Sequence, residues 1–120
     1  MSEPCNDGNI HEDMIEITKN FIEQNTPKEL SDFFRLLSAE TRIKILLALS
    51  KNELCVCNLS EILGKSVSAI SHQLKELRQG RLVKYRQEEG DKHRFYSLEI
   101  EHLEPILKQA LDHIQEEEAE

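Results

Sequence analysis

The chain has 120 residues, of which 38% are hydrophobic and 32% charged, and it has no tryptophan. This length suits one domain with one modest core, and small chains of this kind often complete their core by dimerising. No apolar run approaches the roughly 20 residues that span a bilayer. The polar, acidic start lacks the apolar centre of a signal peptide, so we expect a cytoplasmic protein with no membrane partner.

Three helices are predicted in the first half of the chain from apolar residues at helical spacing. They cover residues 10–24, 27–37 and 39–50. Thr26, followed by a proline at the first helical position, is the predicted N-cap of the second helix, and Ser38 is that of the third.

Two shorter helices follow. Asn58 with Glu61 three residues later resembles a capping box and predicts the start of a fourth helix, which Gly64 stops. Ser66 is the predicted cap of a fifth helix over residues 67–79, which ends at the next glycine.

The fifth helix carries two stripes of different chemistry. The apolar stripe consists of Val67, Ile70, Leu74 and Leu77. The polar stripe consists of Ser68, Ser71, His72 and Lys75, at positions i, i+3, i+4 and i+7. Short serine and histidine side chains allow a helix to lie deep in the major groove and to hydrogen-bond base edges.

A β-hairpin and a last helix complete the chain. Residues 82–87 and 93–98 alternate in polarity or carry aromatics, and EEGD joins them. An amphipathic helix over residues 100–116 precedes a frayed acidic tail. A helix, a short turn with glycine, a polar-faced second helix and a basic hairpin predict a mainly α fold with a β-hairpin wing, the winged helix-turn-helix.

The charge distribution supports a nucleic-acid partner although the net charge is −8. Residues 65–94 contain eight Lys or Arg against four Asp or Glu, so this segment carries +4 and the remainder −12. The basic residues suited to phosphate contacts are Arg78, Arg81, Lys84, Arg86, Lys92 and Arg94.

Two cysteines, Cys55 and Cys57, are separated by one residue just before the helix-turn-helix. A disulfide between them would be strained, so these thiols are expected to be metal ligands or redox groups. A closed soft-metal site needs three or four ligands, and Cys5 in the N-terminal arm is a third thiol. We find no nucleophile-base pair, phosphate-binding glycine loop or paired carboxylates, so no enzyme is expected. A metal chaperone would leave the basic hairpin without a purpose.

The segment ELCVCNLSEILGKSVSAISHQLKELRQGRLVKYRQEEGDKHRFYSL closely resembles the ArsR/SmtB family of metal-responsive transcriptional repressors. The resemblance lies in the ELCVC box, the SxSAISHQLKxLR helix and the wing, and it extends over residues 30–116. It implies a homodimeric winged helix whose first and last helices form the dimer interface. The metal-free dimer would bind double-stranded operator DNA and release it when metal binds.

The resemblance also implies roles for particular residues and parts of the chain. Ser68, Ser71 and His72 would reach bases, with Gln73 nearby, and the wing would touch the DNA backbone. Residues 1–26 would be a flexible arm and first helix, 27–99 the DNA-binding core, and 100–120 the dimerisation helix with its acidic tail. The full predicted DNA-binding set is Ser66, Ser68, Ser71, His72, Gln73, Lys75, Arg78, Lys84, Arg86, Lys92 and Arg94.

The thiol site looks like that of the cadmium- and lead-sensing members, in which the arm of the partner subunit supplies two cysteines. This arm supplies only Cys5, so His11, Asp7 or water would complete the set around Cys55 and Cys57. Ligand softness ranks Cd(II) first as the effector ion, with Zn(II) and Pb(II) next, and no organic cofactor is expected. When metal binding makes the protein release its operator, efflux or detoxification genes would be derepressed.

Two other signals are alternatives to a divalent metal ion. The arsenic-sensing members place a third cysteine where this chain has Ser60, although Cys5 can still complete a three-sulfur site for arsenite or antimonite. A repressor that senses thiol oxidation, with Cys5 resolving the oxidised thiol, is another alternative.

The family's zinc site on the last helix would use His102 of one subunit with His113 and Glu116 of the other. Ile100 stands where the family has aspartate, which leaves Glu99 or Glu101 as substitutes. His93 in the wing is read as facing DNA or solvent.

Overall fold

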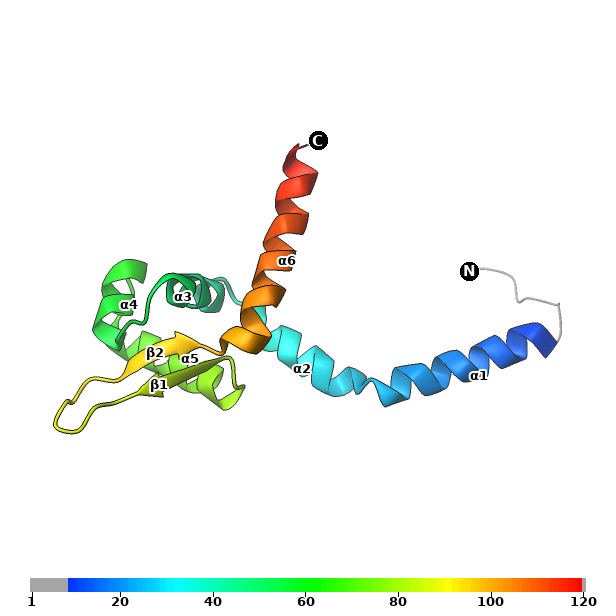
Figure 1. Cartoon of the computed structure of the whole chain (residues 1–120), viewed down its shortest axis with the longest axis horizontal. Coiled ribbons are helices and arrows are strands. Elements are labelled where there is room, and N and C mark those ends of the chain that lie inside the picture. Colours follow the sequence, from blue (N-terminus) through cyan, green and yellow to red (C-terminus); the bar gives the residue numbers. More distant parts are fainter. Residues whose placement is uncertain (1–8, 120) are drawn as a thin grey trace. The chain divides into compact units, whose positions relative to one another are not determined.

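A computed structural model describes residues 9–119 of the chain (Figure 1). The chain divides into two compact units, one ending at Arg35 and the other beginning at Leu36. Within the described residues, no helix is both long enough and apolar enough to cross a membrane.

The first unit is helical. It contains α1 (Asn9–Gln24) and most of α2 (Pro27–Leu37), as predicted. Thr26 precedes α2 with φ of 45°, in the left-handed region, whereas an N-cap residue is normally extended. Its carbonyl nevertheless accepts the first bond of the helix, from the Leu30 N–H at 3.0 Å. Thr26 therefore begins the helix through its backbone.

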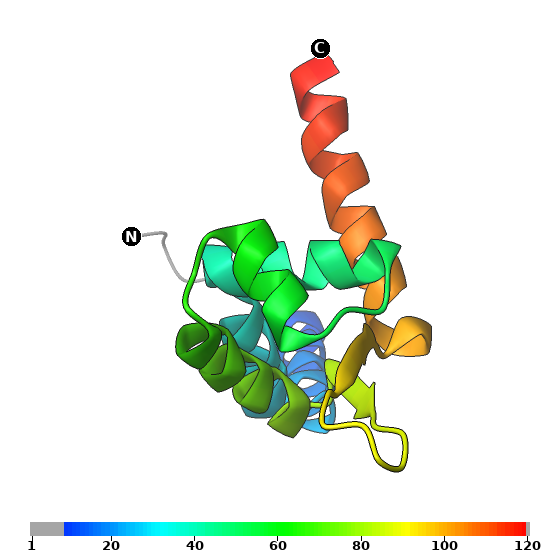
Figure 2. The same ribbon diagram turned by 90° about the vertical axis from the view of Figure 1, so that its left-hand side faces the viewer.

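The second unit holds four helices and a two-stranded antiparallel sheet among its described residues. After the end of α2 come α3 (Glu40–Lys51), α4 (Val56–Leu63), α5 (Val67–Gln79), β1 (Val83–Arg86), β2 (Phe95–Leu98) and α6 (Ile100–Ala119). Figures 1 and 2 show that the loop between the strands extends away from the helices and that the C-terminal half of α6 projects from the rest of this unit. This is the predicted mainly α fold with a hairpin wing.

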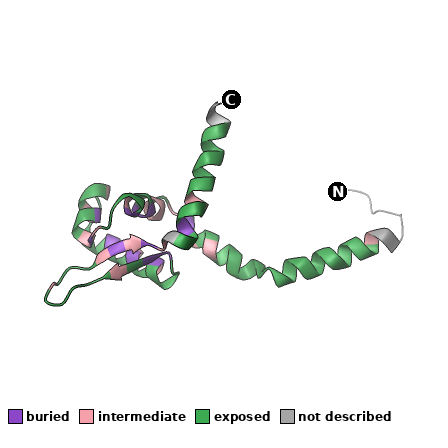
Figure 3. Ribbon diagram, viewed as in Figure 1, coloured by how far each residue is buried: buried purple, intermediate pink, exposed green. Residues whose placement is uncertain are grey.

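One apolar core joins these elements (Figure 3). Its fully buried side chains come from α3, α4, α5, β2 and the start of α6, and are Ile45, Leu46, Leu59, Ile70, Leu74, Leu77, Leu98 and Leu103. The apolar spacing of α5 thus predicted the buried face correctly at three of its four positions. Val67 is 48% exposed, because it occupies the first position of the helix.

Three predicted boundaries are wrong by one to three residues. The N-cap of α3 is Ala39 rather than Ser38, and Ala39 has no capping side chain. The N-cap of α4 is Cys55, so Asn58 is the third helical residue and not the cap. The last helix continues into the acidic tail as far as Ala119.

Gly80 ends α5 for a packing reason. Its φ of −83° is open to any residue, and the left-handed position is the next one, Arg81, with φ of 62°. A Cβ at Gly80 would collide with the Leu36 side chain. A larger residue at this position would therefore require the Leu36 side chain to move, because α5 ends directly against the end of α2.

The hairpin has a defined register, with Val83 opposite Leu98 and Arg86 opposite Phe95. Gly90, with φ of 85°, supplies the left-handed residue of its loop. The segment before α4 adds one more bridge to β2, because Leu54 and Tyr96 exchange N–H···O bonds of 3.1 and 2.8 Å. This bridge holds the cysteine segment beside the wing.

Candidate nucleic-acid interface and thiol site

The outward face of α5 is polar and exposed. The Ser66 hydroxyl accepts a hydrogen bond from the Ala69 N–H at 3.1 Å, which confirms the predicted cap. The polar stripe of α5, which is Ser68, Ser71, His72 and Lys75, is exposed along its whole length. Because these side chains are exposed, the short serine and histidine side chains among them can approach base edges.

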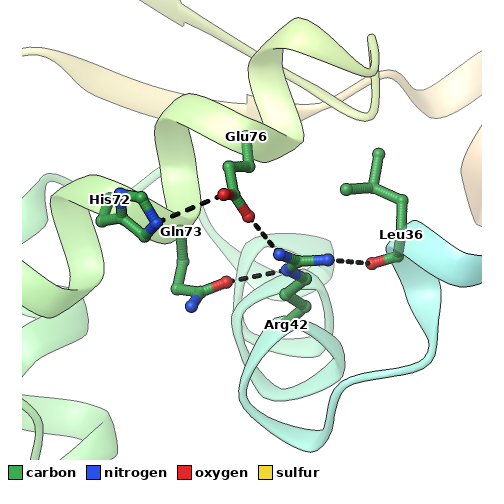
Figure 4. Close-up of polar contacts among 5 residues, drawn as sticks. All are labelled: Leu36, Arg42, His72, Gln73 and Glu76. Atoms are coloured by element: carbon green, nitrogen blue, oxygen red, sulfur yellow. Dashed lines mark hydrogen bonds and ion pairs between the residues drawn. The ribbon is translucent and has the colours of Figure 1, made fainter.

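Gln73 lies apart from this stripe and turns toward α3 (Figure 4). Its amide oxygen accepts from Arg42 Nε at 2.8 Å. The Arg42 guanidinium also pairs with Glu76 and donates to the Leu36 carbonyl at 3.3 Å. His72 Nε2 lies 3.2 Å from the other Glu76 oxygen. This network, the Arg42 clamp, ties α5, the predicted recognition helix, to α3 and to the end of α2.

The sequence analysis did not predict the Arg42 clamp, although the position of Arg42 in α3 indicates it. Arg42 stands three, four and seven residues before Ile45, Leu46 and Leu49, the buried positions of α3. Helical spacing therefore places its guanidinium on the inward face. A buried-face arginine requires a carboxylate or carbonyl partner.

The predicted phosphate-binding residues fall into two groups. Arg86 pairs with Glu53 at 2.8 Å and with Glu88 at 2.9 Å, and Lys84 lies 3.6 Å from Glu99. The hydrogen bond to Glu53 raises the pKa of Arg86 above its usual value, with Glu88 adding to the effect. These two cations are already neutralised by the protein's own carboxylates.

The other group lacks carboxylate partners. Across the described residues, Arg78, Arg81, Lys92 and Arg94 of the predicted set take part in no ion pair, and neither does Lys75 of α5. The guanidiniums of Arg78 and Arg94 stack on the Tyr85 ring, at 5.2 and 4.4 Å from its centroid. Stacking orients a guanidinium and leaves its N–H groups available to an anion. Lys75, Arg78, Lys92 and Arg94 are called the unpaired cations below; Lys19, Lys51, Lys65 and Arg81 also have no ion pair among the described residues.

This division predicts unequal effects of two wing arginines, both stacked on aromatic rings. Replacing Arg94 by alanine should flatten the slope of log affinity for DNA against log salt by about 0.9, the value expected for one lost phosphate contact. Arg86→Ala should leave the slope nearly unchanged, since Glu53 and Glu88 already hold that charge. Fluorescence anisotropy across a salt series measures both slopes. Equal flattening in the two variants would contradict the division.

The two cysteines occupy different environments. Cys55 is buried as the N-cap of α4, and both its N–H and its Sγ lie 3.2 Å from the Asn58 side-chain oxygen. Cys57, in the first turn of α4, is exposed. The side chains at this spacing therefore provide one sheltered and one accessible sulfur.

Both cysteines line a pocket of about 360 Å³ together with α5 and the wing. The pocket's polar lining residues are Ser71, Lys75, Arg78, Lys92, His93 and Arg94, and Tyr96 forms part of its wall. His93 thus faces the thiol pocket, with Nδ1 3.1 Å from Asp91. The His93 backbone N–H also bonds to Asp91 and lowers the pKa of that carboxyl. The sequence pattern did not predict that the thiols and the DNA-facing cations share one pocket.

The predicted metal ligands are only partly brought together. Cys55 and Cys57 are neighbours, whereas Cys5 and Asp7 lie outside the described residues. His11 belongs to α1 in the first unit. No group of three or more His, Cys, Asp or Glu within the described residues is placed to hold an ion. The thiol pair is therefore part of a ligand set and not a complete one.

The C-terminal candidates all lie on α6. Glu101, His102, His113 and Glu116 are exposed on this helix. Eleven residues of helix separate the two histidines by about 16 Å, so one helix cannot bring both to one ion. A site at these residues requires a second copy of the chain.

A mainly helical apolar core, an exposed polar helix after a short turn and a basic hairpin define a winged helix-turn-helix DNA-binding protein. Residues 39–85 match the family model described as "Bacterial regulatory protein, arsR family". The chain is 34% identical to the transcriptional repressor SmtB homolog of Synechocystis, over 93% of this chain and 84% of that protein. The chain belongs to the arsR family of bacterial regulatory proteins.

Two further relatives extend the comparison. A CadC homolog of Staphylococcus aureus, a cadmium resistance transcriptional regulatory protein, is 36% identical over 89% of this chain and 88% of its own. The crystal structure of AntR, an antimony-specific transcriptional repressor, matches with a TM-score of 0.67 and 26% identity, over 78% of this chain and 84% of AntR. All three relatives are transcriptional regulators; the description of the CadC homolog names cadmium, that of AntR names antimony, and that of the SmtB homolog names no element.

Proposed function

We propose that this chain is a cytoplasmic, metal-responsive transcriptional repressor that releases its operator on binding Cd(II), Pb(II) or Zn(II), and so derepresses efflux or detoxification genes. One observation carries the proposal. The thiol pair lies in the same pocket as Ser71 and Lys75 of the recognition helix and the basic residues of the wing. The similarity to SmtB and CadC homologs supports the same reading.

DNA binding uses the exposed face of α5 and the wing. Ser68, Ser71 and His72 contact base edges in the major groove, with Ser66 and Gln73 at the margin of the contact. Because Gln73 and His72 both join the Arg42 clamp, their role includes holding α5 in position. Phosphate contacts come chiefly from the unpaired cations, with Lys84 and Arg86 contributing less.

The chemistry of the pocket fits a soft ion. Cys55 and Cys57 supply two sulfurs, and Cys5 from the arm supplies the third, with His11 as a candidate fourth ligand. Three thiolates with one divalent ion carry a net charge of −1, which the unpaired cations around the pocket stabilise. To donate its sulfur, Cys55 must give up the contact with the Asn58 oxygen.

The coupling between metal and DNA is reciprocal. Metal weakens DNA binding by the same factor by which DNA weakens metal binding. A coupling of ~3 kcal/mol changes affinity more than a hundredfold. The Leu54–Tyr96 bridge joins the thiol segment to β2 of the wing, and the short turn after α4 joins it to α5. A movement of the thiol segment on metal binding would therefore reach both elements proposed to contact DNA.

Arsenite or antimonite is the second candidate effector. The similarity to the antimony-specific repressor AntR favours it. A trigonal site of three sulfurs from Cys5, Cys55 and Cys57 would serve such an ion, since Ser60 provides no third local thiol. A second, zinc-type site on α6 would use His102 with His113, Glu116 and Glu101 across a dimer.

Homodimerisation accounts for the exposed apolar residues of the outer helices. On α1 these are Met14, Ile15, Ile17, Phe21 and Ile22, and on α6 they are Leu111 and Ile114. Phe21→Ser should raise the dimer dissociation constant by about a hundredfold, since a symmetric interface loses the burial of two rings. Lys19→Ser on the same helix is the control. Sedimentation equilibrium measures both constants, and an unchanged dimer in Phe21→Ser would contradict this assignment.

The direct test is a titration of the reduced, metal-free protein with Cd(II) under anaerobic conditions. The near-ultraviolet thiolate-to-metal band should grow to saturation, and Cys5→Ser should weaken it. Binding of Cd(II) or Zn(II) without this band would move the sensor to α6. If neither ion binds, the metal-sensing proposal fails, and titration with arsenite and with peroxide distinguishes the two remaining inputs.

A further inference from the structure

The thiol pocket has the properties of an anion site. It is formed by three separate parts of the second unit, which are the start of α4, the exposed side of α5 and the wing. The unpaired cations all line it, and none of its lining residues in the described part of the chain is a carboxylate. Concave sites lined by charges of one sign concentrate the field and attract counter-ions.

Hydrogen-bond donors accompany the charge. The Ser71 hydroxyl lines the pocket, and Arg78 and Arg94 offer N–H groups held in place by their stacking on Tyr85. Cys55, Val56 and Cys57 at the start of α4 line the pocket as well. Such a set of fixed donors suits the oxygens of a phosphate group.

We propose that this pocket holds a phosphodiester group of the DNA backbone, and that bound DNA thereby covers Cys57. The inference rests on the proposed function, in that DNA is the source of the phosphate. The exposed stripe of α5 and the wing flank the pocket on either side, so a duplex that contacts both must pass across its mouth. The thiols and the phosphate then compete for one space.

In this arrangement an effector bound at the thiols releases DNA by excluding the DNA phosphate from the pocket. An effector at Cys57 takes the volume and the cations that the phosphate uses. By the same linkage, DNA protects Cys57 from reagents in solution. Cys55 is buried and contributes little to such reactivity.

The first test measures how fast iodoacetamide, a neutral reagent, alkylates Cys57 in a Cys5→Ser background, by mass spectrometry of peptides. A mixed-sequence duplex is added at low salt to about ten times its dissociation constant, measured in parallel by anisotropy. Alkylation should slow about tenfold, because only the unbound fraction reacts. If the duplex binds and Cys57 reacts at its original rate, the pocket proposal is overturned and the repressor proposal stands. If the duplex does not bind, both fail.

The second test compares two adducts of similar size on Cys57. Iodoacetate leaves a negative carboxymethyl group, and iodoacetamide leaves a neutral carbamidomethyl group. The charged adduct should weaken DNA binding about tenfold more than the neutral one, since like charges would face each other in the pocket. Equal weakening by the two adducts would show that no phosphate enters the pocket and would overturn the proposal.

Discussion

Cys57→Ser is expected to leave the repressor on its DNA at Cd(II) concentrations that release the unmodified protein. A hydroxyl is a hard, weakly binding ligand for a soft ion. The variant should therefore lose the coupling free energy of ~3 kcal/mol, and Cd(II) should no longer lower its DNA affinity more than a hundredfold. Cys57 is exposed, and the change preserves size, so the fold should not change. Anisotropy of a labelled duplex, selected by the protein from a random pool, measures the release.

Two controls accompany this prediction. DNA affinity without metal should be the same in both proteins, because serine keeps the pocket's shape and charge. Mg(II), an ion that prefers oxygen ligands, should release neither protein. Full Cd(II) release of the Cys57→Ser variant would remove the thiol pair from the sensing mechanism.

Arg42→Ala is expected to cost about 2 kcal/mol of unfolding free energy, in the range for hydrogen bonds to charged groups that are partly buried. The exposed fractions of the two side chains, 19% for Arg42 and 34% for Glu76, show that this ion pair is partly buried. The change also frees Gln73 and the Leu36 carbonyl. Since the clamp holds α5, DNA affinity should fall although Arg42 contacts no base.

Lys44→Ala is the matched control on the same helix. Lys44 lies 3.8 Å from Glu40 in an exposed pair, for which an i,i+4 contribution of about 0.3–0.5 kcal/mol is typical. Urea unfolding at one fixed protein concentration compares the variants, because the stability of a dimer depends on concentration. Equal losses in the two variants would refute a specific role for the clamp.

The elements with strong local signals were predictable from the sequence. The Ser66 cap and the end of α4 at Gly64 are found as predicted, and three of the four apolar residues predicted to face the core from α5 are buried. Such features depend on residues within one or two turns of each other, so a short window contains the physics. The hairpin follows from alternation and a glycine turn in the same way.

Helix starts were less predictable where capping is chemically unusual. Ala39 caps α3 without a side-chain bond, and Cys55 caps α4 while Asn58 returns a bond to it. Neither alanine nor cysteine is a preferred N-cap, so propensity pointed to the nearest serine and asparagine instead.

By itself, the sequence determined the side-chain chemistry from which a DNA-binding face and a soft-ion site are predicted, because that chemistry is local. Only the tertiary structure decided which of these side chains act together. Glu53 neutralises Arg86 from 33 residues away, and the Leu54–Tyr96 bridge brings the thiols to the wing across 42 residues. Contacts between distant residues depend on how the core closes, and no local pattern records them. For that reason the shared pocket of thiols and unpaired cations emerged only from the fold.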